Sequence, residues 1–131
     1  MKKILFVEDD ASLYRMYSTE LELGGYKVVW ESNGGNACSK AQSESPDLIL
    51  LDIMLPEMDG ITILQNLKSS DITKDIPVFV LTNFGDEENI KKALEGGAED
   101  FILKYKIVPS ELAQKVDTFF NTDSSKGVSL T

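Results

Sequence analysis

A run of four apolar residues without a polar interruption, Leu48-Ile49-Leu50-Leu51, constrains the fold more than any other feature of the sequence. A strand with one face in water alternates apolar and polar residues, so a strand without alternation is buried on both faces. Parallel sheets covered by helices on both sides bury their central strands in this way. The run therefore predicts a central strand of an α/β sheet.

Strand-length apolar runs alternate with helix-length amphipathic segments along the whole chain. The expected strands are Lys3–Val7, Lys27–Trp30, Leu48–Leu51, Val78–Leu81 and Phe101–Leu103. The expected helices are Ser12–Leu23, Asn36–Ser43, Gly60–Ser69, Asp86–Glu95 and Pro109–Phe120. This order predicts parallel pairing with right-handed crossovers, and hence a doubly wound five-stranded parallel sheet, (βα)5. We expect this domain over residues 1–121, and a flexible C-terminal tail or linker stub over the polar residues 122–131.

Charge and composition exclude several classes of function. The chain has 22 acidic against 13 basic residues, a net charge of -9, which predicts no direct binding to nucleic acid or to an anionic membrane. The absence of histidine excludes His-based triads and His metal sites, and a single cysteine allows no internal disulfide. No apolar run approaches the length of a membrane helix, so we expect a cytoplasmic protein.

Polar residues follow four of the five expected strands. Because the carboxyl ends of parallel strands lie at one edge of a sheet, we expect these residues to meet in one cleft. They are Glu8-Asp9-Asp10 after the first strand, Asp52 after the third, Thr82-Asn83 after the fourth and Lys104 after the fifth.

Each of these residues alone has an ordinary explanation. Asp10 can cap the following helix and Asp52 can be a turn residue. Together, however, Glu8, Asp9 and Asp52 would repel one another, and a divalent cation removes that conflict. Oxygen ligands without His or Cys suit Mg²⁺, and an aspartate approached by a phosphoryl donor can act as a nucleophile.

The same residues resemble the receiver domains of two-component response regulators, such as the chemotaxis regulators, over roughly residues 3–120. The resemblance is carried by four segments: Ile4-Leu5-Phe6-Val7-Glu8-Asp9, the run from Pro46 to Gly60 with Asp52 at its centre, Ile76 to Thr82, and Gly97 to Lys104. It implies a flavodoxin-like strand order of 2-1-3-4-5.

The resemblance also implies a role for each residue of the cleft. Asp52 corresponds to the phosphoacceptor, Asp9 to a direct Mg²⁺ ligand, and Glu8 to a ligand through water or a supporting acid. The remaining roles are a backbone carbonyl ligand from Met54, a switch hydroxyl from Thr82, a phosphate-pairing ammonium from Lys104, an aromatic switch residue at Phe101, and a peripheral helix cap at Asp10.

The implied function is a signalling switch rather than an enzyme. A sensor histidine kinase or histidine phosphotransfer protein would donate the phosphoryl group, and the domain would catalyse its own phosphorylation and slow dephosphorylation. A downstream effector protein would read the altered fourth helix, fifth strand and fifth helix. A phosphorylation-linked homodimer is a further hypothesis, with Asp100 and Lys115 as a speculative pair.

Tyr105 is the main departure from the family pattern, which usually has a proline after the lysine. We expect a trans peptide bond there and a loop, Tyr105–Val108, about one residue longer than usual. Three alternatives remain: a Mg²⁺-dependent phosphatase, a flavin-binding protein and a pseudo-receiver that never takes phosphate. The phosphatase needs a second Asp where Met54 stands, and the flavin protein needs a phosphate loop where Glu8-Asp9-Asp10 stands.

Overall fold

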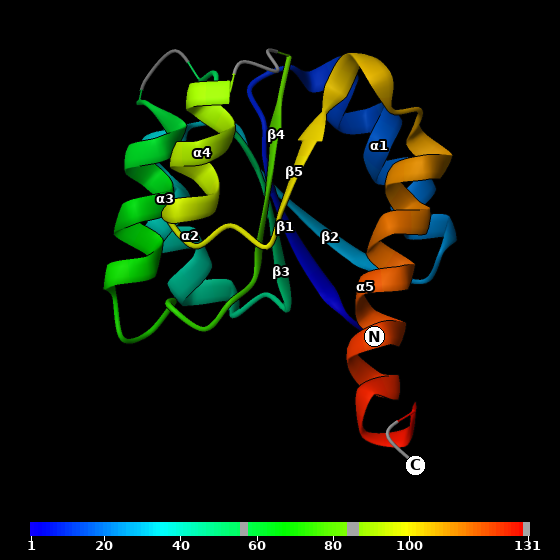
Figure 1. The fold of residues 1–131 in the computed structure, drawn as a ribbon. Coiled ribbons are helices and arrows are strands. Elements are labelled where there is room, and N and C mark those ends of the chain that lie inside the picture. Colours follow the sequence, from blue (N-terminus) through cyan, green and yellow to red (C-terminus); the bar gives the residue numbers. More distant parts are fainter. Residues whose placement is uncertain (56–57, 84–86, 130–131) are drawn as a thin grey trace.

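A five-stranded parallel sheet in the order β2-β1-β3-β4-β5 forms the centre of the computed structural model (Figure 1). The structure describes residues 1–55, 58–83 and 87–129, with the backbone alone at 105 and 122–129. The strands are β1 (Lys3–Val7), β2 (Lys27–Glu31), β3 (Leu48–Asp52), β4 (Val78–Thr82) and β5 (Asp100–Leu103). The predicted strand order and fold class are confirmed.

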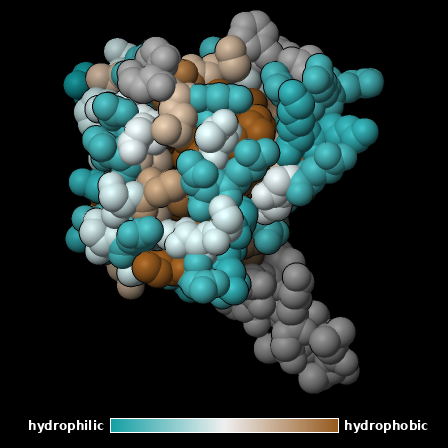
Figure 2. All heavy atoms as spheres, turned by 90° about the vertical axis from the view of Figure 1, so that its left-hand side faces the viewer, coloured by the Kyte–Doolittle hydropathy of each residue, from teal (hydrophilic) through white to brown (hydrophobic). Residues whose placement is uncertain are grey.

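Helices cover both faces of this sheet. Helices α1 (Ala11–Leu23) and α5 (Pro109–Ser129) lie on one side, and α2 (Ala37–Glu44), α3 (Gly60–Ser69) and α4 (Glu87–Glu95) lie on the other (Figure 1). Two short 3₁₀ turns, η1 (Gly34–Asn36) and η2 (Lys104–Lys106), precede α2 and α5. The outer surface on the α2, α3 and α4 side carries many hydrophilic residues, with apolar residues visible between them (Figure 2).

The core consists of two apolar layers separated by the sheet. Leu48 and Leu50 of β3 pack among residues of α1 and α5, whereas Ile49 and Leu51 pack among residues of α2, α3 and α4. Every residue of β3 is buried. The uninterrupted apolar run of β3 therefore faces two layers, as predicted.

The end of the last helix differs from the sequence-based expectation. Helix α5 continues to Ser129 instead of ending at Phe120. No proline stands between Phe120 and Ser129, so no residue there is barred from continuing a helix whose first turns are already packed. Where the receiver domain ends stays a prediction. Asp86, the expected start of the fourth helix, lies outside the described residues.

The segment after β5 forms the turn η2, and no cis peptide bond occurs among the described residues, as expected at Tyr105. No helix in the described ranges is both long enough and apolar enough to cross a membrane.

Candidate functional site

The sheet register brings the predicted site residues to one edge. Asp52 is the last residue of β3, and Glu8 follows β1 directly, where Val7 pairs with Leu51. Thr82 ends β4 opposite Leu103, the residue before Lys104. The carboxyl ends of β1, β3, β4 and β5 thus carry the cluster that the sequence predicts.

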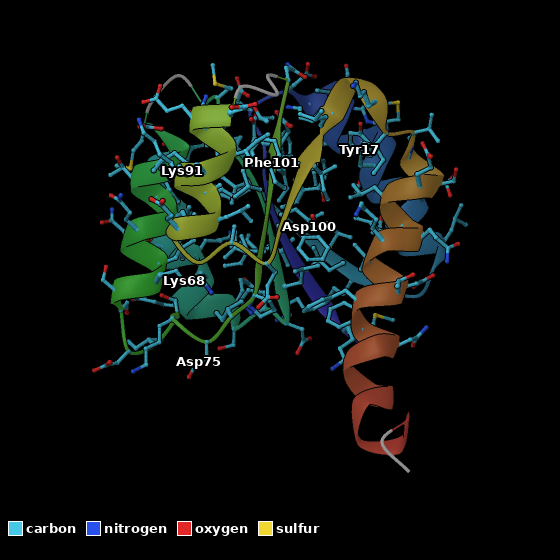
Figure 3. All side chains as sticks on the ribbon, in the orientation of Figure 1. Tyr17, Lys68, Asp75, Lys91, Asp100 and Phe101 are labelled. Carbon is cyan, nitrogen blue, oxygen red and sulfur yellow. The ribbon has the colours of Figure 1, made fainter. Side chains whose placement is uncertain are left out.

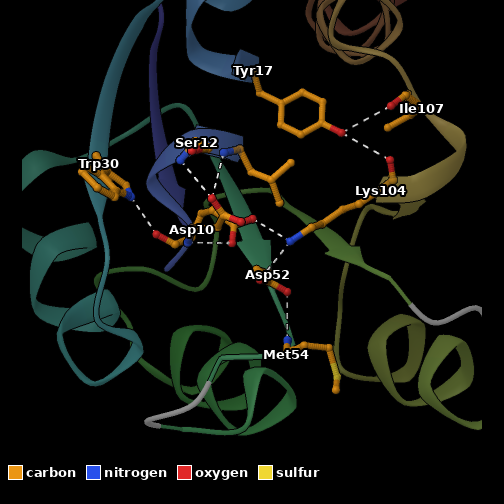
Figure 4. Close-up of polar contacts among 10 residues, drawn as sticks. Asp10, Ser12, Tyr17, Trp30, Asp52, Met54, Lys104 and Ile107 are labelled. Carbon is orange, nitrogen blue, oxygen red and sulfur yellow. Dashed lines mark hydrogen bonds and ion pairs between the residues drawn. The ribbon is translucent and has the colours of Figure 1, made fainter. Parts of the chain in front are cut away.

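A buried ion triad lies at the centre of this edge (Figure 4). The Lys104 ammonium donates to Glu8 Oε1 at 2.7 Å and to Asp52 Oδ2 at 3.1 Å. The exposed fractions are 0% for Glu8, 2% for Asp52 and 6% for Lys104. Removing Lys104 would leave two buried carboxylates without a counter-charge, so both acids depend on this lysine.

Burial sets the protonation of this triad. It raises the pKa of the Glu8 carboxyl from 4.5 to about 7, helped by the negative charge of Asp52 and opposed by the hydrogen bond from Lys104. Burial alone would lower the pKa of the Lys104 ammonium, but the hydrogen bond to Glu8 and the charges of both carboxylates outweigh burial and raise it. Lys104 therefore stays protonated between the two acids.

Asp52 is held through both carboxylate oxygens. Oδ2 accepts from Lys104, and Oδ1 accepts from the backbone N–H of Met54 at 2.9 Å. The Met54 side chain extends outward and is 48% exposed. Its backbone carbonyl as a metal ligand stays a prediction.

Three carboxylates meet with the spacing of a metal site. Oxygen atoms of Glu8, Asp9 and Asp52 lie within 4.8 Å of one another, with Asp9 exposed at the rim. This set offers only oxygen, the ligand that Mg²⁺ and other hard cations prefer, and it concentrates negative charge, so the residues fit a divalent cation. Asp10 instead caps α1, accepting from the N–H groups of Ser12 at 2.9 Å and Leu13 at 3.1 Å, as expected of a peripheral residue.

The expected switch residues lie on β4 and β5, the two strands next to β3 on one side of the sheet. Thr82 is fully buried at the end of β4. Phe101 of β5 is half-buried, packs against the core on the α4 side, and lines a groove of about 470 Å³ between β5 and α5 (Figure 3). The roles of Thr82 and Phe101 as switch residues stay predictions.

Gly60 lies where the chain turns back from the site into α3. A Cβ atom there would lie 2.1 Å from the Cα of Ile53. The Gly60 N–H also donates to the Ile53 carbonyl at 3.2 Å. A side chain at this position would therefore be hindered.

Two contacts at the site were missed by reasoning from the sequence. The Trp30 indole donates to the backbone carbonyl of Glu8 at 2.7 Å. The Tyr17 hydroxyl lies 3.3 Å from the backbone carbonyls of both Lys104 and Ile107, and so ties η2 to α1. The position of Trp30 at the end of the strand next to β1 was the available signal, whereas Tyr17 looked like any core residue of a helix.

A buried aspartate beside acids and a lysine, at the carboxyl edge of a doubly wound sheet, defines a class of signalling domain controlled by phosphorylation. The chain matches the model of the response regulator receiver domain over residues 4–117. It belongs to the response regulator receiver family, and its function is phosphorylation-dependent signalling.

Relatives and solved structures agree with this membership. The chain is 40% identical over 115 residues to the phosphate regulon transcriptional regulatory protein PhoB of Pseudomonas aeruginosa, covering 88% of this chain and 50% of PhoB. It spans about half the length of the curated relatives it matches. A CheY-like receiver domain protein of Methanospirillum hungatei is 27% identical, with a TM-score of 0.86 over 96% of this chain and 98% of that one.

A further structural relative carries a metal. The Mn²⁺-bound form of the response regulator Rcp1 is 27% identical, with a TM-score of 0.81 over 92% of this chain and 94% of that one. In this chain, Glu8, Asp9 and Asp52 form the acidic cluster whose spacing fits a divalent cation.

Proposed function

We propose that Asp52 accepts a phosphoryl group from a phosphohistidine of a sensor histidine kinase or histidine phosphotransfer protein. The observation that carries the proposal is the buried Asp52 carboxylate, held by Lys104 and the Met54 N–H within reach of two further acids. Histidine kinases are the partners with which response regulators interact.

The transfer needs one bond made and one broken. An Asp52 carboxylate oxygen forms a bond to phosphorus while the phosphorus–nitrogen bond of the phosphohistidine breaks, and the departing imidazole takes a proton from solvent. Lys104 compensates the charge of the transferring group, and the Thr82 hydroxyl is suited to donate to it. Mg²⁺, held by Asp9, Asp52, the Met54 carbonyl and Glu8 directly or through water, would neutralise charge between donor and acceptor. The domain would thereby catalyse its own phosphorylation and its slow reversal.

The signal then follows from charge. Phosphorylation adds about -2 at neutral pH, and this charge attracts Thr82 and competes for Lys104, whose ammonium pairs with Glu8 and Asp52. Phe101, between the core and the β5–α5 groove, would change its packing as Thr82 moves. An effector protein that reads this surface is the proposed output, rather than nucleic acid.

The homodimer remains a hypothesis. Asp100 and Lys115, the speculative pair across its interface, form an ion pair within one chain. Lys115 Nζ lies 2.9 Å from Asp100 Oδ2 of the same chain, with both side chains well exposed. Exposed pairs of this kind contribute little, so Lys115 could exchange partners at low cost.

Acetyl phosphate labelling tests the assignment of Asp52. With Mg²⁺, the wild type is expected to gain one phosphoryl group by intact-protein mass spectrometry, and Asp52→Asn none. Asp10→Asn is the matched control, because it removes a nearby carboxylate but keeps a good helix cap, and it should label normally. Labelling that persists in Asp52→Asn would refute the assignment.

Beryllofluoride distinguishes the switch from a pseudo-receiver. Tryptophan and tyrosine fluorescence should change on addition of Mg²⁺ and then beryllofluoride, and chelation of Mg²⁺ should abolish labelling by acetyl phosphate. A folded protein that responds to neither addition would be a pseudo-receiver.

A further inference from the structure

The peptide unit that joins Glu8 to Asp9 is held by a side chain of the neighbouring strand (Figure 4). The indole N–H of Trp30 donates to the Glu8 carbonyl at 2.7 Å, while the Glu8 N–H donates to the Glu31 carbonyl at 3.0 Å. Both backbone polar groups of Glu8 are therefore bonded to residues of β2.

This contact lies just beyond the last paired residues of β1 and β2. The paired register of β1 and β2 ends at Val7 and Glu31, so no further ladder pair sets the direction of the backbone. The Glu8 carbonyl belongs to the planar peptide unit that leads into Asp9. Holding that carbonyl sets the orientation of the plane, and with it the directions in which the side chains of Glu8 and Asp9 leave the backbone.

Trp30 is itself held in place. Its ring stacks on Tyr14 of α1, with centroids 4.7 Å apart and planes 9° from parallel. Tyr14 in turn meets the buried Phe6 ring edge-on at 5.6 Å. Trp30 stays 37% exposed, more than its apolar neighbour Phe6 on β1, which is fully buried. An aromatic side chain fixed at one face and bonded through its N–H is suited to hold a backbone group in one direction.

We propose that Trp30 is a positioning residue of the metal site. Its indole N–H holds the Glu8–Asp9 peptide in the orientation that lets Glu8, Asp9 and Asp52 share one cation. This inference rests on the proposed metal site and deepens it. The positioning effect depends on the indole N–H group of Trp30 and not on the bulk of its ring.

Calorimetric titration with Mg²⁺ tests this dependence. Trp30→Phe keeps a ring to stack on Tyr14 but has no N–H, and its Kd for Mg²⁺ should rise about fivefold, as expected for one hydrogen bond. Tyr14→Leu is the matched control, because it removes the stack and keeps the N–H, and its Kd should change less than about twofold.

Phosphorylation kinetics separate positioning from damage to the fold. In Trp30→Phe the half-saturating Mg²⁺ concentration for labelling by acetyl phosphate should rise with the Kd, while the rate at saturating Mg²⁺ stays that of the wild type. A folded Trp30→Phe protein with the wild-type Kd would overturn the inference. A Tyr14→Leu variant whose Kd for Mg²⁺ rises as much as that of Trp30→Phe would also overturn the inference.

The unmodified protein offers a second measurement, should Trp30→Phe fail to fold. The chain has one tryptophan, so its indole N–H gives a single assigned signal in a ¹H–¹⁵N NMR spectrum. That signal should move during a Mg²⁺ titration with the calorimetric Kd, and an unmoved signal at saturation would overturn the inference. If the wild type binds no Mg²⁺ at all, the proposed metal site fails and this inference fails with it.

Discussion

Burial of Glu8 should make the metal-free protein lose stability as the pH rises, and Glu8→Gln should remove this loss. The pKa of Glu8 is raised from 4.5 to about 7, chiefly by burial and then by the charge of Asp52. The folded state therefore holds the Glu8 proton more tightly than the unfolded state. The stability this confers is fully present below pH 4.5 and is lost as the pH rises through about 7.

The magnitude follows from the same pKa. A rise from 4.5 to about 7 corresponds to roughly 3 kcal/mol. In Glu8→Gln the amide oxygen can still accept from Lys104, but the amide nitrogen cannot accept from the Asp10 N–H, which donates to Glu8 at 3.2 Å. That lost bond costs about 1 kcal/mol at every pH. The variant should thus be about 1 kcal/mol less stable than the wild type in acid and about 2 kcal/mol more stable above neutrality.

Urea unfolding in EDTA, followed by circular dichroism from about pH 5 to about pH 8, measures this difference. Asp10→Asn is the control, because it removes a carboxylate near the site without removing the buried one, and it should keep the wild-type pH dependence. Adding Mg²⁺ should flatten the wild-type curve, since the metal binds the deprotonated acids. The reasoning is refuted if Glu8→Gln loses as much stability across this range as the wild type does.

Three substitutions test the supports around the site. Gly60→Ala should destabilise the protein by about 2 kcal/mol or more in thermal unfolding, because its Cβ would overlap the Ile53 Cα, and an unchanged melting temperature would contradict this. Tyr17→Phe should cost about 1 kcal/mol in urea unfolding, because the Lys104 and Ile107 carbonyls lose a buried donor. Asp10→Ala should cost about 1 kcal/mol by removing the α1 cap, whereas Asp10→Asn should cost almost nothing; equal losses in the two would argue against the cap.

The fold and the triad were predictable because they follow from patterns local in sequence. Leu48–Leu51 predicts burial on both faces, and the alternation of strands and helices then leaves few topologies. Because parallel strands end at one edge of their sheet, the sequence alone is enough to place Glu8, Asp52 and Lys104 together. The structure adds the order of contacts, with Lys104 between the two acids.

The supporting contacts were not predictable, because they join residues far apart in the chain. Tyr17 and Lys104 are 87 residues apart, and only the packing of α1 beside η2 brings them together. In the sequence, Trp30 looks like any other aromatic residue of a strand. Its hydrogen bond to Glu8 depends on the register of β2 on β1. The length of α5 was also missed, because the residues after Phe120 are mostly poor helix formers and their composition favours a loose tail.

The charges at the site explain why the metal and the phosphoryl group belong to one mechanism. Glu8, Asp9 and Asp52 with Lys104 leave two negative charges when all are ionised, the charge that one divalent cation neutralises. Without the cation, burial relieves the excess by raising the pKa of Glu8. A phosphoryl donor brings further negative charge toward Asp52, which Lys104 alone cannot balance because it already pairs with both buried acids. We therefore expect metal binding to precede or accompany phosphorylation, and we expect any residue that orients Glu8 and Asp9, as proposed for Trp30, to act on phosphorylation through the metal.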